Sequence, residues 1–160
     1  GGSGVHIAAV CGGRVTDFGI TDANNMGAAM APAAADTIAN FLTDTATTPE
    51  DYDLIVTGDL SQVGSELLRD LLERKGIKLG SKHADCGLMM YDREKQDVHA
   101  GGSGCGCSAS ILCSYFLSKL EKKELNNLLF VATGALMSPT SSQQGESIPG
   151  IAHLIHLTSA

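Results

Sequence analysis

The segment from Val98 to Ile111, VHAGGSGCGCSASI, concentrates residue types that carry chemistry. It places four glycines and two cysteines within fourteen residues, behind one histidine and ahead of an apolar helical pattern. Four roles fit such a segment: a phosphate loop, a metal clip, the seat of a nucleophile, or the tight entrance to a helix. Each role requires partners, and the rest of the sequence decides which partners are present.

Phosphate binding lacks its partners. A P-loop closes with Lys and Ser or Thr, and this segment has no Lys. The run Gly104–Ala109 matches the GxGxxA form of the dinucleotide fingerprint, but no clear strand precedes it. About twenty residues on, no acidic residue closes a second strand. The sequence favours glycines that let two backbones approach closely where a helix begins.

Metal binding is also weakly supported. Cys105 and Cys107 form a CxC pair, with His99 and Cys113 nearby in sequence. Structural zinc sites usually show two closely spaced pairs of ligands. Cys107 and Cys113 are six residues apart, which places them on different faces of a helix. Buried, unreactive thiols are therefore favoured over metal ligands.

A nucleophile or an anion site remains open. A thiol at a helix N-terminus has a lowered pKa, which would suit Cys105 or Cys107. A nucleophile also needs a base, and the sequence cannot place one beside it. The free N–H groups of the helix start, with Ser103 and Ser108, would bind a carboxylate, and this chemistry is preferred. The candidate bases are His83, His99, His153 and His156.

Composition limits the class of protein. The 160 residues suffice for one domain, and 43% hydrophobic with 18% charged residues is a globular composition. The net charge of -7, without a Lys or Arg cluster, argues against nucleic acid or anionic lipid as a partner. No apolar run approaches the ~20 residues of a membrane span, and no signal peptide is visible. Five cysteines, an odd number, indicate a reducing compartment.

Hydrophobic periodicity predicts the elements that position these residues. The order is β-α-β-α-β-α-β-β, an α/β fold with a mixed five-stranded sheet and helices. The strands are largely parallel, and the last two are joined by a loop alone and pair antiparallel. Residues 1–4 are interpreted as a linker or tag remnant and residues 5–160 as one domain. The predicted strands are 5–19 with a bulge at Gly12–Gly13, 53–59, a weak one in 83–92, one within 125–137, and 151–159; the helices are 26–44, 62–76 and 105–123, with a loop at 139–150.

Four long segments resemble the stage V sporulation protein AD family of endospore-forming bacteria: NNMGAAMAPAAADTI, YDLIVTGDL, HAGGSGCGCSASI and TGALMSP with GESIPGIAHLI. That family is thiolase-like, with two similar βαβαβαββ halves. The resemblance implies that residues 5–160 are the C-terminal half. It also implies a non-catalytic protein without a cofactor, which binds dipicolinic acid with or without Ca²⁺. Uptake of that ligand into the forespore involves membrane-embedded proteins of the same operon, with this chain peripheral at the forespore or spore inner membrane.

The wider thiolase superfamily implies where the pocket lies. Cys105 stands where related enzymes keep a His or Asn, and Gly58 or Asp59 where they keep a second His. A third loop, which carries a cysteine in thiolases, holds Met137 and Ser138 instead. Since the bases for condensation are missing, the resemblance implies ligand binding without catalysis. The implied ligand-binding residues are Gly58, Asp59, Cys105, Gly106, Cys107, Ser108, Met137 and Ser138, and Asp59 would repel a dicarboxylate unless Ca²⁺ or a proton intervened.

Two alternatives stay open. One is residual acyltransferase or thioesterase activity that uses Cys105. The other is an interaction module, because a lone half leaves bare the surface that packs against its counterpart. The small-residue helix from Met26 to Leu42 is the predicted contact. The expected assembly is a homodimer that imitates the two-half arrangement, or else the chain lacks its N-terminal half.

Overall fold

Five strands form one mixed sheet in the computed structural model, which describes residues 4–160. They are β1 Val5–Cys11, β2 Leu54–Thr57, β3 His83–Asp85, β4 Asn127–Ala135 and β5 Gly150–Ser159. The order across the sheet is β1-β5-β4-β2-β3. β2 is parallel to β3 and β4, whereas β5 is antiparallel to both β4 and β1. The predicted α/β class with a mixed five-stranded sheet is confirmed, including the antiparallel last pair.

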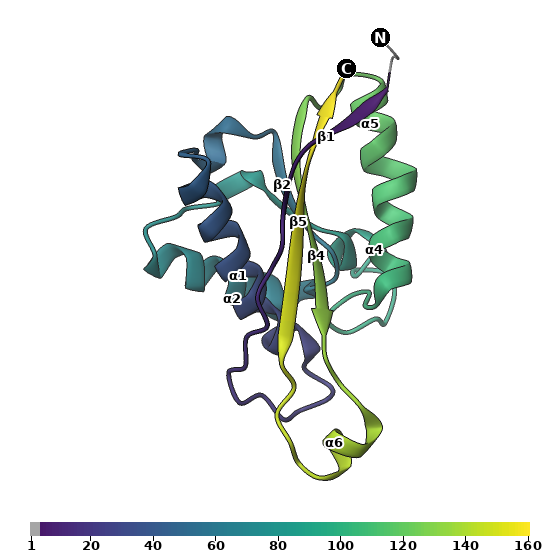
Figure 1. Cartoon of the computed structure of the whole chain (residues 1–160). Helices are drawn as coiled ribbons and strands as arrows, with labels where there is room; N and C mark the ends of the chain where they lie inside the picture. The colour runs from purple at the N-terminus through teal and green to yellow at the C-terminus, as the bar shows by residue number, and fades with distance from the viewer. Residues whose placement is uncertain (1–3) are drawn as a thin grey trace.

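The helices lie on both faces of the sheet. They are α1 Met26–Asp44, α2 Ser61–Arg74, α3 Cys86–Met89, α4 Cys105–Ile111, α5 Leu117–Glu121 and α6 Pro139–Gln143, with 3-10 turns at Pro49–Asp51 and Gly80–Lys82. A π-helical turn, Leu112–Phe116, joins α4 to α5, so residues 105–121 are one helical segment. Figure 1 shows α1 and α2 on one side of the sheet and α4 and α5 on the other.

α1 has the boundaries that the sequence predicts, 26–44. The Asn25 side chain accepts a hydrogen bond from the Ala28 N–H, which caps the helix. The alanines let α1 pack closely against the sheet and α2, and a Cβ at Gly64 of α2 would lie 2.9 Å from the Gly27 Cα. Most of the helix is buried within the chain. The prediction that the helix from Met26 to Leu42 is the exposed contact for a partner is therefore wrong.

Three segments differ from the prediction. β1 ends at Cys11, and at Gly13 the backbone lies so close to the Ala152 carbonyl oxygen that no Cβ would fit. Its register shift lies between Ile7 and Ala9, not at Gly12–Gly13. The weakly predicted strand in 83–92 is only β3, after which the Asp85 side chain caps α3. The predicted loop 139–150 contains α6, which the Ser138 hydroxyl caps.

Two apolar cores flank the sheet. One lies between the sheet and α1 and α2, and includes Ile38, Leu68 and Val131. The other lies between the sheet and the segment 105–121, and includes Phe116 and Phe130. The outer face of that segment is exposed from Cys105 onward and carries small uncharged side chains. These exposed residues are Cys105, Gly106, Ala109, Ser110, Cys113 and Ser114, followed by the larger Tyr115, which is also exposed.

The two ends of the described chain lie close together (Figure 1), and the Ala160 N–H donates to the Gly4 carbonyl oxygen at 3.0 Å. The first three residues of the predicted linker, 1–4, lie outside the described residues. None of the helices in residues 4–160 has the length and apolar character that crossing a bilayer requires.

Candidate functional site

The turn after β2 lies against the start of α4, so the fold brings two of the three predicted segments together. Gly58 is buried, and a Cβ there would lie 3.0 Å from both the Ser108 Oγ and the Thr133 Oγ1. Both contacts are polar side chains, one from α4 and one from β4. A residue larger than glycine would push them apart. The predicted pocket residues Gly58 and Ser108 are therefore neighbours.

The Asp59 carboxylate connects the turn after β2 to β4 and to the start of α4 through hydrogen bonds. The Thr133 hydroxyl donates to Oδ1 at 2.6 Å, and the Gly104 N–H donates to Oδ2 at 2.6 Å. The Ser103 hydroxyl also donates to Oδ2, at 3.4 Å. In return, the Asp59 N–H donates to the Thr133 Oγ1 at 3.1 Å. The start of α4 thus already receives a carboxylate from its own chain.

This arrangement changes the expected electrostatics of the site. Asp59 is buried, and neutral donors within the chain solvate its carboxylate. These hydrogen bonds do not cancel the negative charge, so an incoming carboxylate needs Ca²⁺ or a proton between itself and Asp59. The helix start, however, is not an empty anion site, because the Gly104 N–H is occupied by Asp59.

The cysteines divide into two environments. Cys105 and Cys113 are exposed, whereas Cys86 and Cys107 are buried in the core under α4. Burial raises the pKa of Cys107, and the nearby Asp59 and Asp85 raise it further. Burial, Asp85 and Cys107 raise the pKa of the Cys86 thiol to about 12. The interpretation as buried thiols holds for Cys107 and is wrong for Cys105 and Cys113, which are exposed.

Three of the four candidate bases are engaged away from the α4 thiols, and the fourth, His99, is exposed with its Nδ1 3.6 Å from the Asp97 Oδ1. His83 bonds to the Thr57 hydroxyl, and the His153 Nδ1 accepts the Gly13 N–H. The His156 Nε2 lies 3.2 Å from the Asn127 Oδ1. Within residues 4–160, no recorded hydrogen bond joins a histidine to a cysteine. The same residues contain no cluster of three His, Cys, Asp or Glu side chains suited to a metal ion.

The third predicted segment lies apart from the other two. Met137 and Ser138 follow the end of β4 and are exposed. The Ser138 Oγ accepts a hydrogen bond from the Ser141 N–H at 3.0 Å, so Ser138 caps α6. In Figure 1, α6 lies at the tip of the long β4–β5 connection, beyond the sheet. Their part in binding stays a prediction.

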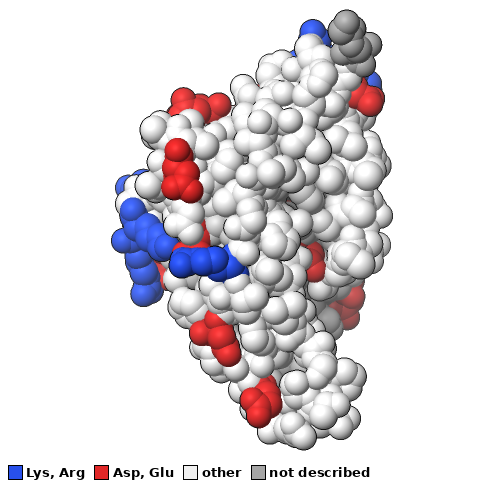
Figure 2. Space-filling view, viewed as in Figure 1, with Lys and Arg blue, Asp and Glu red and all other residues white. Residues whose placement is uncertain are grey.

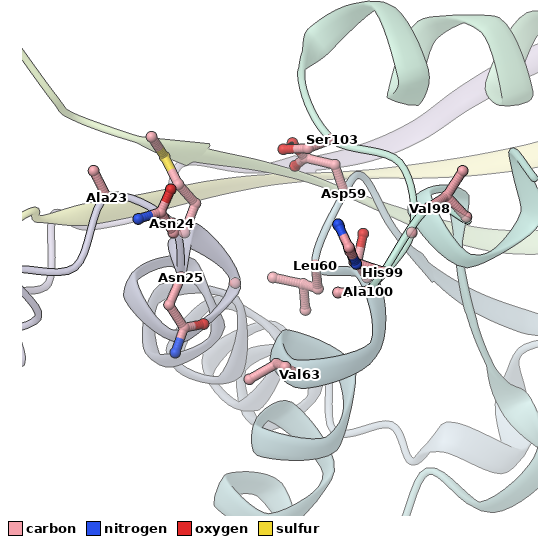
Figure 3. Close-up of a pocket in the computed structure, with 14 residues that line it drawn as sticks. Ala23, Asn24, Asn25, Asp59, Leu60, Val63, Val98, His99, Ala100 and Ser103 are labelled. Atoms are coloured by element: carbon pink, nitrogen blue, oxygen red, sulfur yellow. Dashed lines mark hydrogen bonds between the residues drawn. The ribbon is translucent and has the colours of Figure 1, made fainter. Parts of the chain in front are cut away.

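A cavity of about 480 Å³ opens beside Asp59. Figure 3 shows Ala23 to Asn25 on one side, Leu60 and Val63 below, and His99 and Ala100 opposite, with Asp59 and Ser103 at the far end. The lining offers amide, imidazole and hydroxyl groups. The complete lining is Ala23, Asn24, Asn25, Met26, Gly27, Asp59, Leu60, Ser61, Val63, Val98, His99, Ala100, Gly101 and Ser103.

The sequence interpretation missed two walls of this cavity. Asn24 and Asn25 read as helix-capping residues, and Asn25 does cap α1. The signal for His99 was its place directly before the glycine-rich run, but spacing alone could not show which way the loop folds. His99 adopts a positive φ of 49° and Gly101 a φ of 124°, and these loop conformations carry the chain past the Asp59 turn. Only the fold brings 23–27, 59–63 and 98–103 together.

Comparisons with known proteins identify the family. A family model described as stage V sporulation protein AD matches residues 1–158. Stage V sporulation protein AD of Bacillus subtilis (strain 168) is 52% identical over 149 residues, which are 93% of this chain and 44% of that protein. The chain thus spans less than half the length of this curated relative. Among solved structures, the acetyl-CoA acetyltransferase of Bacillus anthracis matches with a TM-score of 0.45 and 17% identity, over 96% of this chain and 31% of that one. The chain belongs to the stage V sporulation protein AD family.

Proposed function

We propose that this chain is the ligand-binding C-terminal half of a non-catalytic, thiolase-like sporulation protein that binds dipicolinic acid and takes part in its uptake into the forespore. The observation that carries the proposal is the polar cavity of about 480 Å³ beside the Asp59 carboxylate, a group that makes Ca²⁺ or a proton the required bridge to a dicarboxylate. Sites for small molecules combine a concave surface with a few converging polar groups. The proposed donors for a carboxylate are the Asn24 amide and the His99 imidazole, which is 91% exposed at the rim beside Asp97.

Absence of catalysis is part of the proposal. Covalent chemistry needs a nucleophile with a base in reach. Burial and nearby carboxylates raise the pKa of Cys107, which disfavours its thiolate at neutral pH. Cys105 is exposed, and the recorded hydrogen bonds of residues 4–160 place no histidine on it. The arrangement is better suited to holding an anion than to transferring an acyl group.

Calorimetric titration with pyridine-2,6-dicarboxylate, with and without Ca²⁺, tests the ligand. The sample is the longest natural protein that contains this chain. Binding is expected, and His99→Ala is expected to weaken it about 5- to 10-fold, because a hydrogen bond to a charged group is lost. Ca²⁺ is expected to strengthen binding if it bridges Asp59 and the ligand.

Two controls sharpen this titration. His6→Ala removes an exposed histidine from β1, outside the cavity lining, and is expected to leave the affinity unchanged. Benzene-1,3-dicarboxylate keeps both carboxylates without the ring nitrogen and is expected to lose the Ca²⁺ enhancement. The ligand assignment fails if the parent protein shows no binding heat with or without Ca²⁺. The placement in this cavity fails if His99→Ala and His6→Ala bind equally well.

The partner surface follows from the exposed face of residues 105–121. This face carries no charged residue between Cys105 and Ser118, and its small side chains allow another helix to approach closely. Figure 2 shows few charged side chains over β1, β5 and the α4–α5 side in that view, while Lys and Arg gather near α2. We propose that this face packs against the other half of the protein, and that residues 1–160 alone form a homodimer through it. Membrane-embedded sporulation proteins of the same operon are the proposed further partners, with this chain peripheral at the forespore or spore inner membrane.

Light scattering of residues 1–160 at micromolar concentration tests the self-association. A dimer is expected, and Ala109→Glu is expected to shift it toward monomer, because a charge would be buried at the contact. Gln143→Glu adds the same charge on exposed α6 and is expected to leave the dimer intact. A monomeric parent chain, or equal behaviour of the two variants, would contradict the proposed contact.

A further inference from the structure

Asp85 is a buried carboxylate at the end of β3 that connects the elements around the cavity. It is 1% exposed. Oδ2 accepts the Thr57 hydroxyl at 2.6 Å and the Leu60 N–H at 2.9 Å. Oδ1 accepts the Ser61 N–H at 2.9 Å and the Leu88 N–H at 3.2 Å. One carboxylate therefore satisfies donors from β2, from the start of α2 and from the start of α3.

The two helix starts explain why a carboxylate suits this position. The first N–H groups of a helix lack intrahelical acceptors, and the helix dipole favours a negative charge beside them. The starts of α2 and α3 both converge on Asp85. Burial still raises the pKa of Asp85, while these four hydrogen bonds oppose that shift. A residue without acceptor oxygens would leave several buried donors unsatisfied.

Ser61 transmits this anchoring to the cavity wall. It adopts a positive φ of 54°, a strained conformation for a residue with a side chain. Its N–H is held by Asp85, and its hydroxyl donates to the Gly102 carbonyl oxygen at 2.5 Å. The following residue, Gln62, donates its N–H to the Ala100 carbonyl oxygen at 3.0 Å. Two hydrogen bonds from the turn at the start of α2 thus hold the loop 98–103 in place.

The α3 side of Asp85 holds the same loop. The Gly102 N–H donates to the Gly87 carbonyl oxygen at 2.8 Å. A Cβ at Gly101 would lie 2.7 Å from that oxygen, so only glycine allows this approach. Gly87 belongs to α3, whose first turn Asp85 caps. These two attachments of the loop therefore lead back to Asp85, while Asp59 separately holds the end of the loop at Ser103 and Gly104.

A chain of hydrogen-bonded side chains behind Asp85 fixes the orientation of its carboxylate. The Thr57 hydroxyl has one proton, which it donates to Asp85, so the His83 Nε2–H must donate to the Thr57 Oγ1, 3.0 Å away. The His83 Nδ1 then accepts the Arg69 Nε–H at 3.4 Å. Donors run from Arg69 through His83 and Thr57 to Asp85 without a conflict. The chain keeps the Asp85 oxygens aimed at the α2 and α3 starts.

We propose that Asp85 is the positioning residue of the cavity: through Ser61 and α3 it holds the loop 98–103, and thereby His99 and Ser103, in the binding arrangement. The inference deepens the proposed function and rests on it for the identity of the ligand. Asp85 does not itself line the cavity. Its effect on affinity is therefore indirect, through the order of the loop.

Amide hydrogen exchange tests the positioning role of Asp85 without any ligand. The sample is the longest natural protein that contains this chain. Ser61→Ala keeps the backbone strain and removes only the hydroxyl link to Gly102. The Gly102 and Gln62 amides are expected to exchange about 5- to 10-fold faster, with unchanged exchange in β4. Ser65→Ala is the matched control, because this buried hydroxyl on the same helix has no recorded partner in residues 4–160. It is expected to leave the loop amides unchanged.

Asp85→Asn gives the second measurement. The amide keeps one acceptor oxygen and loses the charge, and a larger increase in loop exchange than in Ser61→Ala is expected. The Tm of the Ser61→Ala protein is expected to lie close to that of Ser65→Ala, which shows that the faster exchange is confined to the loop. Uniformly faster exchange across loop and sheet, or identical loop exchange in Ser61→Ala and Ser65→Ala, overturns the positioning role. If the parent protein does not bind the ligand, the proposed function fails, while the exchange measurement still decides the role of Asp85.

Discussion

Acidification from pH 7.5 to 4 is expected to lower the free energy of unfolding by about 3 kcal/mol through His83 alone. Burial, and then the nearby Arg69, lower the pKa of His83 from 6.5 to about 4. Protonation of the His83 ring is disfavoured because the second proton would sit on Nδ1 and face the Arg69 Nε–H donor. The unfolded chain therefore binds a proton at His83 before the folded chain does. Stability is lost as the pH falls from about 6.5 toward 4, and the loss levels off below.

Chemical denaturation of the parent and of His83→Gln at several pH values measures this loss. The Gln side chain retains an N–H donor for the Thr57 hydroxyl but does not titrate. Burial raises the pKa of Asp85, so that carboxyl stabilises the fold as the pH falls and acts in the opposite direction. Because Asp85 is present in both proteins, the difference between them isolates His83. Parallel pH profiles for the two proteins would contradict the assignment, and His6→Gln provides an exposed control.

Phe116→Ala is expected to lower the free energy of unfolding by about 3–5 kcal/mol. Phe116 is fully buried in the core under residues 105–121, together with Val56, Leu128 and Phe130. Truncation removes apolar contact and leaves a cavity between the π-helical turn and the sheet. Since the same segment positions Cys105 and the proposed partner face, the helix is expected to loosen on the sheet.

Urea denaturation at pH 7.5 provides the measurement for Phe116→Ala. Tyr115→Ala is the matched control, because its ring lies edge to face on Phe116 but is 44% exposed. Its expected cost is below about 1 kcal/mol, from one aromatic contact and a cation–π contact with Lys119. Equal destabilisation by the two substitutions would mean that the 105–121 segment does not dock through Phe116.

Much of the fold could be predicted from residue pattern. α1 keeps its predicted limits, because alanine spacing and the Asn25 cap are local signals. The interface prediction for the same helix failed, because small side chains suit contact with any neighbour, and here α2 and the sheet are the neighbours. Strand limits were less certain. A β-rich composition continues past Cys11, but the regular pairing with β5 ends there, opposite Leu154, although β5 itself continues to Gly150.

The candidate site was only partly predictable. Gly58 and Ser108 are neighbours, because strand ends and helix starts meet at one edge of a parallel sheet. Of the eight predicted ligand-binding residues, however, Asp59 alone is in the lining of the cavity. The role of Asp59 differs from expectation, since its carboxylate accepts a hydrogen bond from the Gly104 N–H of the same chain. Asp85 was overlooked, although an acidic residue directly after a predicted strand signals the same edge. Its four donors come from segments separated by up to about thirty residues, which no local pattern reports.

The sequence by itself determined the α/β order, the limits of α1, the glycine-lined entrance to the helix at Cys105, and the family. These depend on residue types, periodicity and motifs that are local in the chain. Only the tertiary structure decided that Asp59 fills the start of α4, that α1 is interior, and that residues 23–27 and 98–103 wall a cavity. The physical reason is that hydrogen-bond partners and burial are properties of segments brought together from distant parts of the chain. In the VHAGGSGCGCSASI segment, residues 98–104 therefore form a loop that Asp85 holds through Ser61 and that Asp59 binds at Gly104, and Cys105–Ile111 form α4.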